Sequence, residues 1–158
     1  MSTALAHSWL DAAHLREVVD HVGTPAFIYS EARFRKNLHR VRRAADEAGL
    51  GDRVEFYIPF FPNSNPHHLK PLLELDGFGV LVQLPSEYEL LRSHGFERFI
   101  VSPGHVCDAE IDYWNRTGCP TFLGSIDEVA HSLAMGSSEI SVRIDSLDSG
   151  KPGIKYGE

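Results

Sequence analysis

Short runs of β-branched and aromatic residues alternate along the chain with longer stretches of helical spacing. The later runs are apolar at nearly every position, as in a strand that is buried on both faces in a parallel sheet covered by helices. They predict strands at 54–60, 78–83, 98–102, 121–124 and 139–145. An earlier run, PAFIYS at 25–30, follows Gly23-Thr24 and predicts a further strand.

Helical spacing predicts helices between these strands. The first two cover about 8–21 and 31–48, and the later ones begin at Pro66, at Pro85, near Asp108 and at Ser125. Ser125 is followed three residues later by Glu128. This spacing is typical of a capping box, in which each side chain bonds the backbone N–H of the other residue.

The strand–helix repeat is about 20–24 residues long and predicts an α/β protein with a mostly parallel sheet and flanking helices. From residue 54 onward the pattern contains five strands, whereas a (β/α)8 barrel has eight, typically over about 250 residues. The sheet is either open and doubly wound or part of a barrel, and we favour a partial (β/α)8 barrel. We expect a single domain over 1–158, with an N-terminal helix and strand in 1–30 and βα units in 31–158.

The charge of the chain argues against some classes of partner. With 22 acidic and 15 basic residues the net charge is −7, which disfavours a nucleic-acid binder because phosphate contacts need a basic footprint. No apolar run is long enough to span a bilayer, and the N-terminus lacks the pattern of a signal peptide. Cys107 and Cys119 match no zinc or redox motif, so we expect a cytoplasmic protein.

Basic residues are concentrated in one predicted helix. The run RFRKNLHRVRR at 33–43 places its apolar residues on one helix face and its arginines on the other. The simpler interpretation is a solvated face, and the alternative is a docking surface for an acidic partner.

His7, His14 and His21 recur every seven residues, so neighbours lie about 10 Å apart along a helix. Metal–ligand distances are about 2 Å, and we therefore expect no metal site.

The turn PNSNP at 62–66 follows the strand at 54–60, at the edge of the sheet where α/β folds bind ligands. The chain contains, in order, GTPAFIYSEARFRKNL, VEFYIPFFPNSNPHHLKPLLELDGFGV, PSEYELLRSHGF, FIVSPGHVCDAEI and SVRIDSLDSGKPGIKYG. This series resembles the N-terminal half of the ornithine/diaminopimelate decarboxylase family over about residues 8–158. The resemblance implies an alanine-racemase-like barrel of the kind that uses pyridoxal phosphate.

Members of that family carry a lysine at the end of the first barrel strand, in a pattern like K-A-N-x-N-P. Aligned on Asn63, Asn65 and Pro66, this chain has Phe61 at the lysine position, and a shift of one residue places Phe60 there. Only a primary amine forms a Schiff base with the cofactor aldehyde. We therefore expect no catalytic residue at this position and no cofactor bound by this chain alone.

A second departure from the family follows the next strand, where the family resembles D-V-x-S-x-x-E-L. Here Leu81 stands at the acidic position, Leu84 at the serine position, and only Glu87 is kept. A glutamate in the first turn of a helix is explained by the helix dipole alone. Replacing a lysine and an aspartate together removes a charge pair without leaving an unpaired charge, and it suggests a pocket converted to core.

Three further residues are candidates for contact with a ligand. Arg143 matches an arginine that lies near the cofactor in the family, although it can instead pair with Asp145 or Glu139. His105 lies in a loop after a strand and is either a ligand contact or an ordinary loop histidine. Asn63 lies in the turn beside Phe61 and is the third candidate.

The resemblance and the missing lysine together favour a non-catalytic subunit that acts with a partner chain. We expect a homo- or hetero-oligomer, which could include a complementary decarboxylase-like chain, with no nucleic-acid or membrane partner. The alternative is a split or repurposed enzyme that acts on a small amino-acid-like molecule. Its pocket would lie near Phe60, Phe61, His105 and Arg143.

Overall fold

The computed structural model describes residues 12–144, which divide between Ser30 and Glu31 into two units. In the first unit, helix α1 (Ala12–Val22) agrees with the predicted helix at about 8–21, whose first residues lie outside the described part. Gly23 follows the helix with a φ of 78°. Glycine adopts this left-handed conformation without steric cost, so it is a suitable residue to end the helix.

The predicted strand at 25–30 is wrong, because this segment has no regular secondary structure. Phe27 and Tyr29, the aromatic residues of the run that predicted the strand, are both exposed. Pro25 has no N–H to donate to a neighbouring strand. Aromatic residues favour a strand only where a sheet surface covers them, so the local pattern was misleading here.

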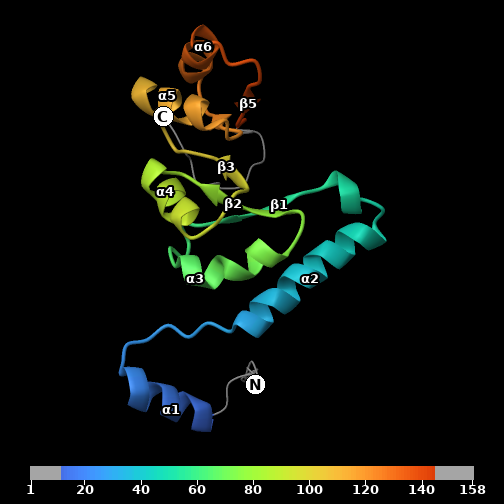
Figure 1. The fold of residues 1–158 in the computed structure, drawn as a ribbon, viewed down its shortest axis with the longest axis vertical. Helices are drawn as coiled ribbons and strands as arrows, with labels where there is room; N and C mark the ends of the chain where they lie inside the picture. Colours follow the sequence, from blue (N-terminus) through green and yellow to red (C-terminus); the bar gives the residue numbers. More distant parts are fainter. Residues whose placement is uncertain (1–11, 145–158) are drawn as a thin grey trace, which may run out of the picture. The chain divides into compact units, whose positions relative to one another are not determined.

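In the second unit, strands and helices alternate as the sequence pattern predicts (Figure 1). The helical segments are α2 (Glu31–Glu47), the 3-10 helix η1 (Gly51–Arg53), α3 (Pro66–Leu69), the 3-10 helix η2 (Lys70–Glu74), α4 (Pro85–Ser93), α5 (Asp108–Thr117) and α6 (Ile126–Ala134). The strands are β1 (Phe56–Pro59), β2 (Phe78–Val82), β3 (Phe99–Val101), β4 (Phe122–Leu123) and β5 (Ser141–Val142). All five predicted strands of this unit are confirmed, each shorter than its apolar run.

The helix that begins at Pro66 is short for a local reason. The Asn65 side chain accepts a hydrogen bond from the His67 N–H at 3.0 Å and caps the first turn. Pro71 then interrupts the α-helical ladder because it has no N–H and its ring crowds the preceding turn. The chain continues as the 3-10 helix η2, with the Pro71 ring buried.

The strands are parallel and follow one another in chain order. β1 pairs with β2, β2 pairs with β3, and β4 pairs with β5. The Val101 N–H donates to the Pro120 carbonyl at 2.8 Å, and a parallel bridge joins Val101 to Thr121, so the two sheets are linked. This confirms the predicted α/β class, with a parallel sheet and flanking helices. The order shows no reversal of the kind that marks the ligand site of a doubly wound sheet.

The hydrophobic core lies between the strands and the helices that pack against them. Val80 and Val82 on β2 and Val101 on β3 are fully buried. They belong to one cluster with Leu38 of α2, Leu69 and Leu72 of α3 and η2, Leu91 of α4, Trp114 of α5, and Phe60, Phe78, Phe96 and Phe99. The nearly continuous burial of β2 is what its uninterrupted apolar sequence predicts.

Candidate functional site

Parallel strands place all their carboxyl ends at one edge of the sheet, and the candidate residues follow strands at this edge. After β1 the chain turns immediately. The Phe60 N–H donates to the Leu81 carbonyl at 3.0 Å, and the Asn63 N–H donates back to the Phe60 carbonyl at 3.1 Å. The Phe60 ring is buried in the core, and the Phe61 side chain is 49% exposed. Of these two phenylalanines, Phe61 is therefore the one that the end of β1 presents to solvent.

The prediction that this pocket had become core is wrong. Leu84, which follows β2, is 51% exposed, and Phe61 has nearly the same exposure. Leu81 is partly buried within the strand. The apolar residues that stand at the family's lysine and serine positions thus line the open edge of the sheet, because the described residues provide nothing that covers them.

Ile126 and Ile144 extend this apolar edge. Ile126 begins α6 directly after β4 and is 86% exposed, and Ile144 follows β5 and is 85% exposed. Together with Phe61 and Leu84 they form a set that we call the apolar rim. Each member lies at the carboxyl end of a different strand, so the rim runs along one edge of the linked sheets.

The residues at this edge do not fit pyridoxal phosphate. Within residues 12–144 the lysines are Lys36 in α2 and Lys70 at the start of η2, and both are exposed helical residues. Neither follows a strand, so no described residue supplies a primary amine where the end of β1 could present it to an aldehyde.

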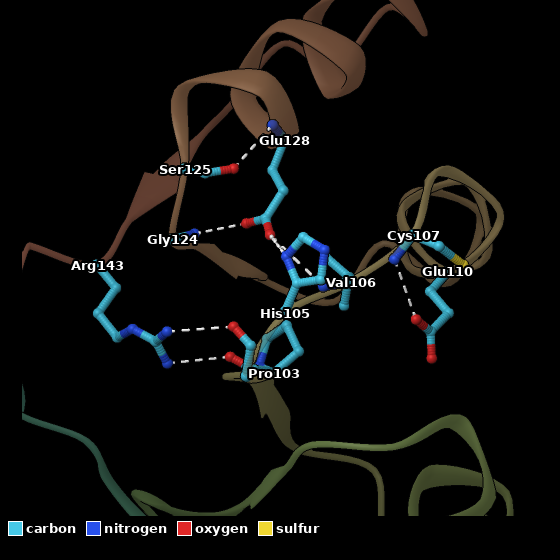
Figure 2. Close-up of polar contacts among 10 residues, drawn as sticks. Pro103, His105, Val106, Cys107, Glu110, Gly124, Ser125, Glu128 and Arg143 are labelled. Carbon is cyan, nitrogen blue, oxygen red and sulfur yellow. Dashed lines mark hydrogen bonds and ion pairs between the residues drawn. The ribbon is translucent and has the colours of Figure 1, made fainter. Parts of the chain in front are cut away.

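A polar cluster lies at the same edge, after β3, β4 and β5 (Figure 2). Its centre is Glu128 of α6, which is only 5% exposed. The Glu128 carboxylate accepts hydrogen bonds from the Gly124 N–H at 2.7 Å and the Val106 N–H at 3.5 Å. It also lies 3.2 Å from Nδ1 of His105. The buried charge is thus stabilised by two backbone donors and one imidazole.

The predicted capping box is confirmed for Ser125 alone. The Ser125 hydroxyl accepts the Glu128 N–H at 3.2 Å, but the Glu128 side chain returns to Gly124 rather than to Ser125. Glu87 and Glu110, which hold the same position in α4 and α5, do return to the capping residue, at 3.2 Å in each case. Glu128 differs because it also reaches the loop after β3.

Arg143 and Glu128 both lie close to Gly124. Its guanidinium donates to the Pro103 carbonyl at 3.0 Å and the Gly104 carbonyl at 3.2 Å. A Cβ on Gly124 would lie 3.1 Å from the arginine and 3.8 Å from the glutamate, so a glycine allows both groups to approach. Among the described residues Arg143 forms no ion pair with Glu139, and Asp145 lies outside them. The arginine is therefore occupied in holding the loop after β3.

Sequence reasoning named His105 and Arg143, and the structure brings both to one loop. It missed Glu128 as the residue between them, because its spacing from Ser125 explained it fully as a cap. Asn63 has no hydrogen bond or ion pair with either residue within the described part of the chain. The site therefore has two parts, the apolar rim after β1, β2, β4 and β5 and the polar cluster after β3, β4 and β5.

The polar part can exchange a proton with a ligand. The His105 side chain is 89% exposed, and its ring is oriented by a buried carboxylate. In the described residues no group of three His, Cys, Asp or Glu side chains could hold a metal ion. No described helix is long and apolar enough to cross a membrane.

Comparison with known proteins shows which proteins this chain resembles in sequence and in fold. No family model matches the chain. A diaminopimelate decarboxylase of Methanothermobacter thermautotrophicus is 26% identical over 145 residues, which are 89% of this chain and 33% of that protein. The predicted resemblance is confirmed. The crystal structure of a lysine/ornithine decarboxylase from Vibrio vulnificus, complexed with cadaverine, superimposes over 91% of this chain with a TM-score of 0.63.

Both matches cover only part of the related protein. The chain spans about a third of the length of the curated relative and 39% of the decarboxylase of known structure. The identity to that structure is 19%, so this comparison establishes a shared fold. The chain is thus similar in sequence and fold to part of a decarboxylase, and its activity requires a separate argument.

Proposed function

We propose that this chain is a non-catalytic relative of the pyridoxal-phosphate-dependent decarboxylases and acts as a partner subunit. The observation that carries the proposal is Phe61, half-exposed at the end of β1 where the family has its lysine. A benzyl side chain cannot condense with an aldehyde. The exposed lysines Lys36 and Lys70 lie in other elements and do not replace it.

The five strands form the first part of a (β/α)8 barrel in this proposal. Their chain order and parallel pairing support a partial barrel. Such a barrel has edges at β1 and β5, whose backbone groups can pair with a further strand. A single domain over 1–158 and a cytoplasmic location belong to the same proposal.

The apolar rim supports a partner at the carboxyl edge. Large apolar side chains exposed on one edge mark interaction sites, and four of them follow the ends of different strands here. We assign the rim to a complementary decarboxylase-like chain, or a second copy, that completes the barrel. A small amino-acid-like ligand would then lie between the rim and this partner.

Absorption spectroscopy tests the non-catalytic part of the proposal. The purified chain is mixed with pyridoxal phosphate, and the spectrum is followed for the band of an internal aldimine. We expect free cofactor alone, because the described residues offer no amine at the site. A saturable aldimine band at one cofactor per chain would contradict the proposal.

A second function, a split or repurposed enzyme, is favoured by one observation. The exposed His105 imidazole next to the buried Glu128 carboxylate is an arrangement that can transfer protons. Incubation of the chain with lysine, ornithine or diaminopimelate, followed by detection of carbon dioxide, tests this function. Carbon dioxide release that is lost in His105→Asn would favour the enzyme over the partner subunit.

A further inference from the structure

We propose that the outward face of α2 is a docking surface for an acidic segment of a partner protein. This surface, the basic stripe, consists of Lys36, Arg40 and Arg43. At 3.6 residues per turn these side chains fall within about 60° of the helix circumference and along about 10 Å of its axis. All of them are exposed.

Two arginines between this face and the buried side of the helix are already committed to the chain itself. Arg35 binds Glu74 through two hydrogen bonds of 2.7 and 2.9 Å and binds Glu31 at 2.8 Å. Arg42 lies 3.5 Å from Asp46 and donates to the Val54 carbonyl at 3.4 Å. These contacts hold α2 against the rest of its unit, so this part of the basic run has a structural role.

The stripe is held less firmly. Among the described residues Lys36 and Arg40 form no ion pair, and Arg43 lies 3.9 Å from Glu47 with both side chains exposed. Successive stripe residues are three or four positions apart, so like charges are neighbours and repel one another along the helix. Carboxylates supplied by a partner would relieve this repulsion.

The charge distribution favours an acidic protein segment over a nucleic acid. Six of the 15 Lys and Arg residues lie in α2, against three of the 22 Asp and Glu residues. The remainder of the chain is therefore strongly acidic and repels a long polyanion, whereas a short acidic segment needs to meet only the stripe.

The shape of the surface agrees with a peptide rather than a small molecule. An open hollow of about 790 Å³ lies along this helix and is lined by eight residues of α2, five of them Lys or Arg. A hollow formed by the side chains of one helix does not enclose a ligand. It can receive the carboxylate side chains of a segment that lies across it.

Fluorescence anisotropy with a short labelled poly-glutamate peptide tests the proposal. The double variant Lys36→Glu/Arg40→Glu is compared with Arg92→Glu/Arg116→Glu, which makes the same change in net charge at exposed positions of α4 and α5. We expect the stripe variant to bind about tenfold more weakly than wild type and the control variant to bind like wild type. Added salt should weaken the wild-type binding, because the contacts are exposed.

Two results would overturn the proposal. One is equal binding by the stripe variant and the control variant. The other is tighter binding of wild type to a single-stranded oligonucleotide than to a peptide of the same charge.

Thermal unfolding is measured to check that both variants are folded. The milder substitutions Lys36→Gln and Arg40→Gln provide a second series, in which the affinity for the peptide should fall stepwise. Neither result depends on whether the chain forms a Schiff base, so the partner-subunit proposal is tested separately.

Discussion

Glu128 shows how far a single residue can be understood from its position in the sequence. Its spacing from Ser125 predicted a cap, and the Ser125 half of that cap is present. The contact with His105 depends on β3 and β4 lying next to each other, which no local pattern reveals. Arg143 was found through the resemblance, but its two carbonyl partners again belong to a neighbouring strand loop.

Removing the Glu128 carboxylate should therefore cost more than removing an ordinary capping carboxylate. Glu128→Ala leaves the buried Val106 N–H and the part-buried Gly124 N–H without their acceptor, and we expect a loss of about 2–3 kcal/mol in the free energy of unfolding. The matched variant Glu110→Ala removes one exposed capping bond and should cost about 0.5–1 kcal/mol. Urea denaturation measures both values, and equal losses would show that the contacts to the β3 loop do not contribute.

His68 of α3 packs against Phe34 of α2, and this contact should make the stability of the fold depend on pH. Its ring stacks on Phe34 with 4.7 Å between ring centroids, and burial lowers the pKa of His68 below 6.5. The unfolded chain therefore takes up this proton first, so His68 stabilises the fold above pH 6.5 and this contribution is lost as the pH falls through the folded pKa. Thermal unfolding from about pH 7 to about pH 5 should show a smaller decrease in Tm for His68→Gln than for wild type. Equal decreases in the Tm of wild type and His68→Gln would contradict this role of His68.

At the scale of elements, hydrophobic periodicity identified the strands and helices from residue 31 onward. It succeeded most clearly at β2, which is buried at four of its five positions, because an apolar run and a buried strand coincide there. It failed at 25–30, where aromatic residues lie exposed outside any sheet. The change from α3 to η2 follows from Pro71, which could be recognised in the sequence but whose effect on helix type could not.

The pairing of β1 with β2 depends on a residue without a side chain. A Cβ at Gly79 would lie 2.5 Å from the Tyr57 ring and 2.8 Å from the Arg98 carbonyl, so Gly79→Ala requires the backbone to shift. We expect a loss of about 1–3 kcal/mol in the free energy of unfolding. Gly104→Ala is the control, because nothing lies within 4 Å of its added Cβ. If both variants unfold at the same denaturant concentration, the close packing of these strands is not a constraint.

At the scale of the whole molecule, the strand order and the apolar rim are the two features that support a partner chain. Sequence reasoning found the parallel strands and the absent lysine, and it expected the neighbouring apolar residues to be buried. Their exposure could not be predicted, because it depends on how many strands surround the edge rather than on the residues themselves. An open edge with large apolar side chains favours association with a second chain.

The apolar rim should therefore control association without affecting the fold. Leu84→Glu/Ile126→Glu changes exposed positions, so the stability of the chain should stay within about 0.5 kcal/mol of wild type. Sedimentation velocity should show self-association of wild type that increases with concentration and is reduced in the variant. If the double variant associates as strongly as wild type, the rim is excluded as the interface.

Reduction with borohydride in the presence of pyridoxal phosphate, followed by peptide mass mapping, tests the central claim most directly. It compares wild type, Phe61→Lys and the matched control Leu84→Lys, whose native side chains are 49% and 51% exposed. We predict no site-specific adduct in wild type, and an adduct at residue 61 in Phe61→Lys that has no counterpart in Leu84→Lys. A stoichiometric adduct on one native lysine of the wild-type chain would contradict the account.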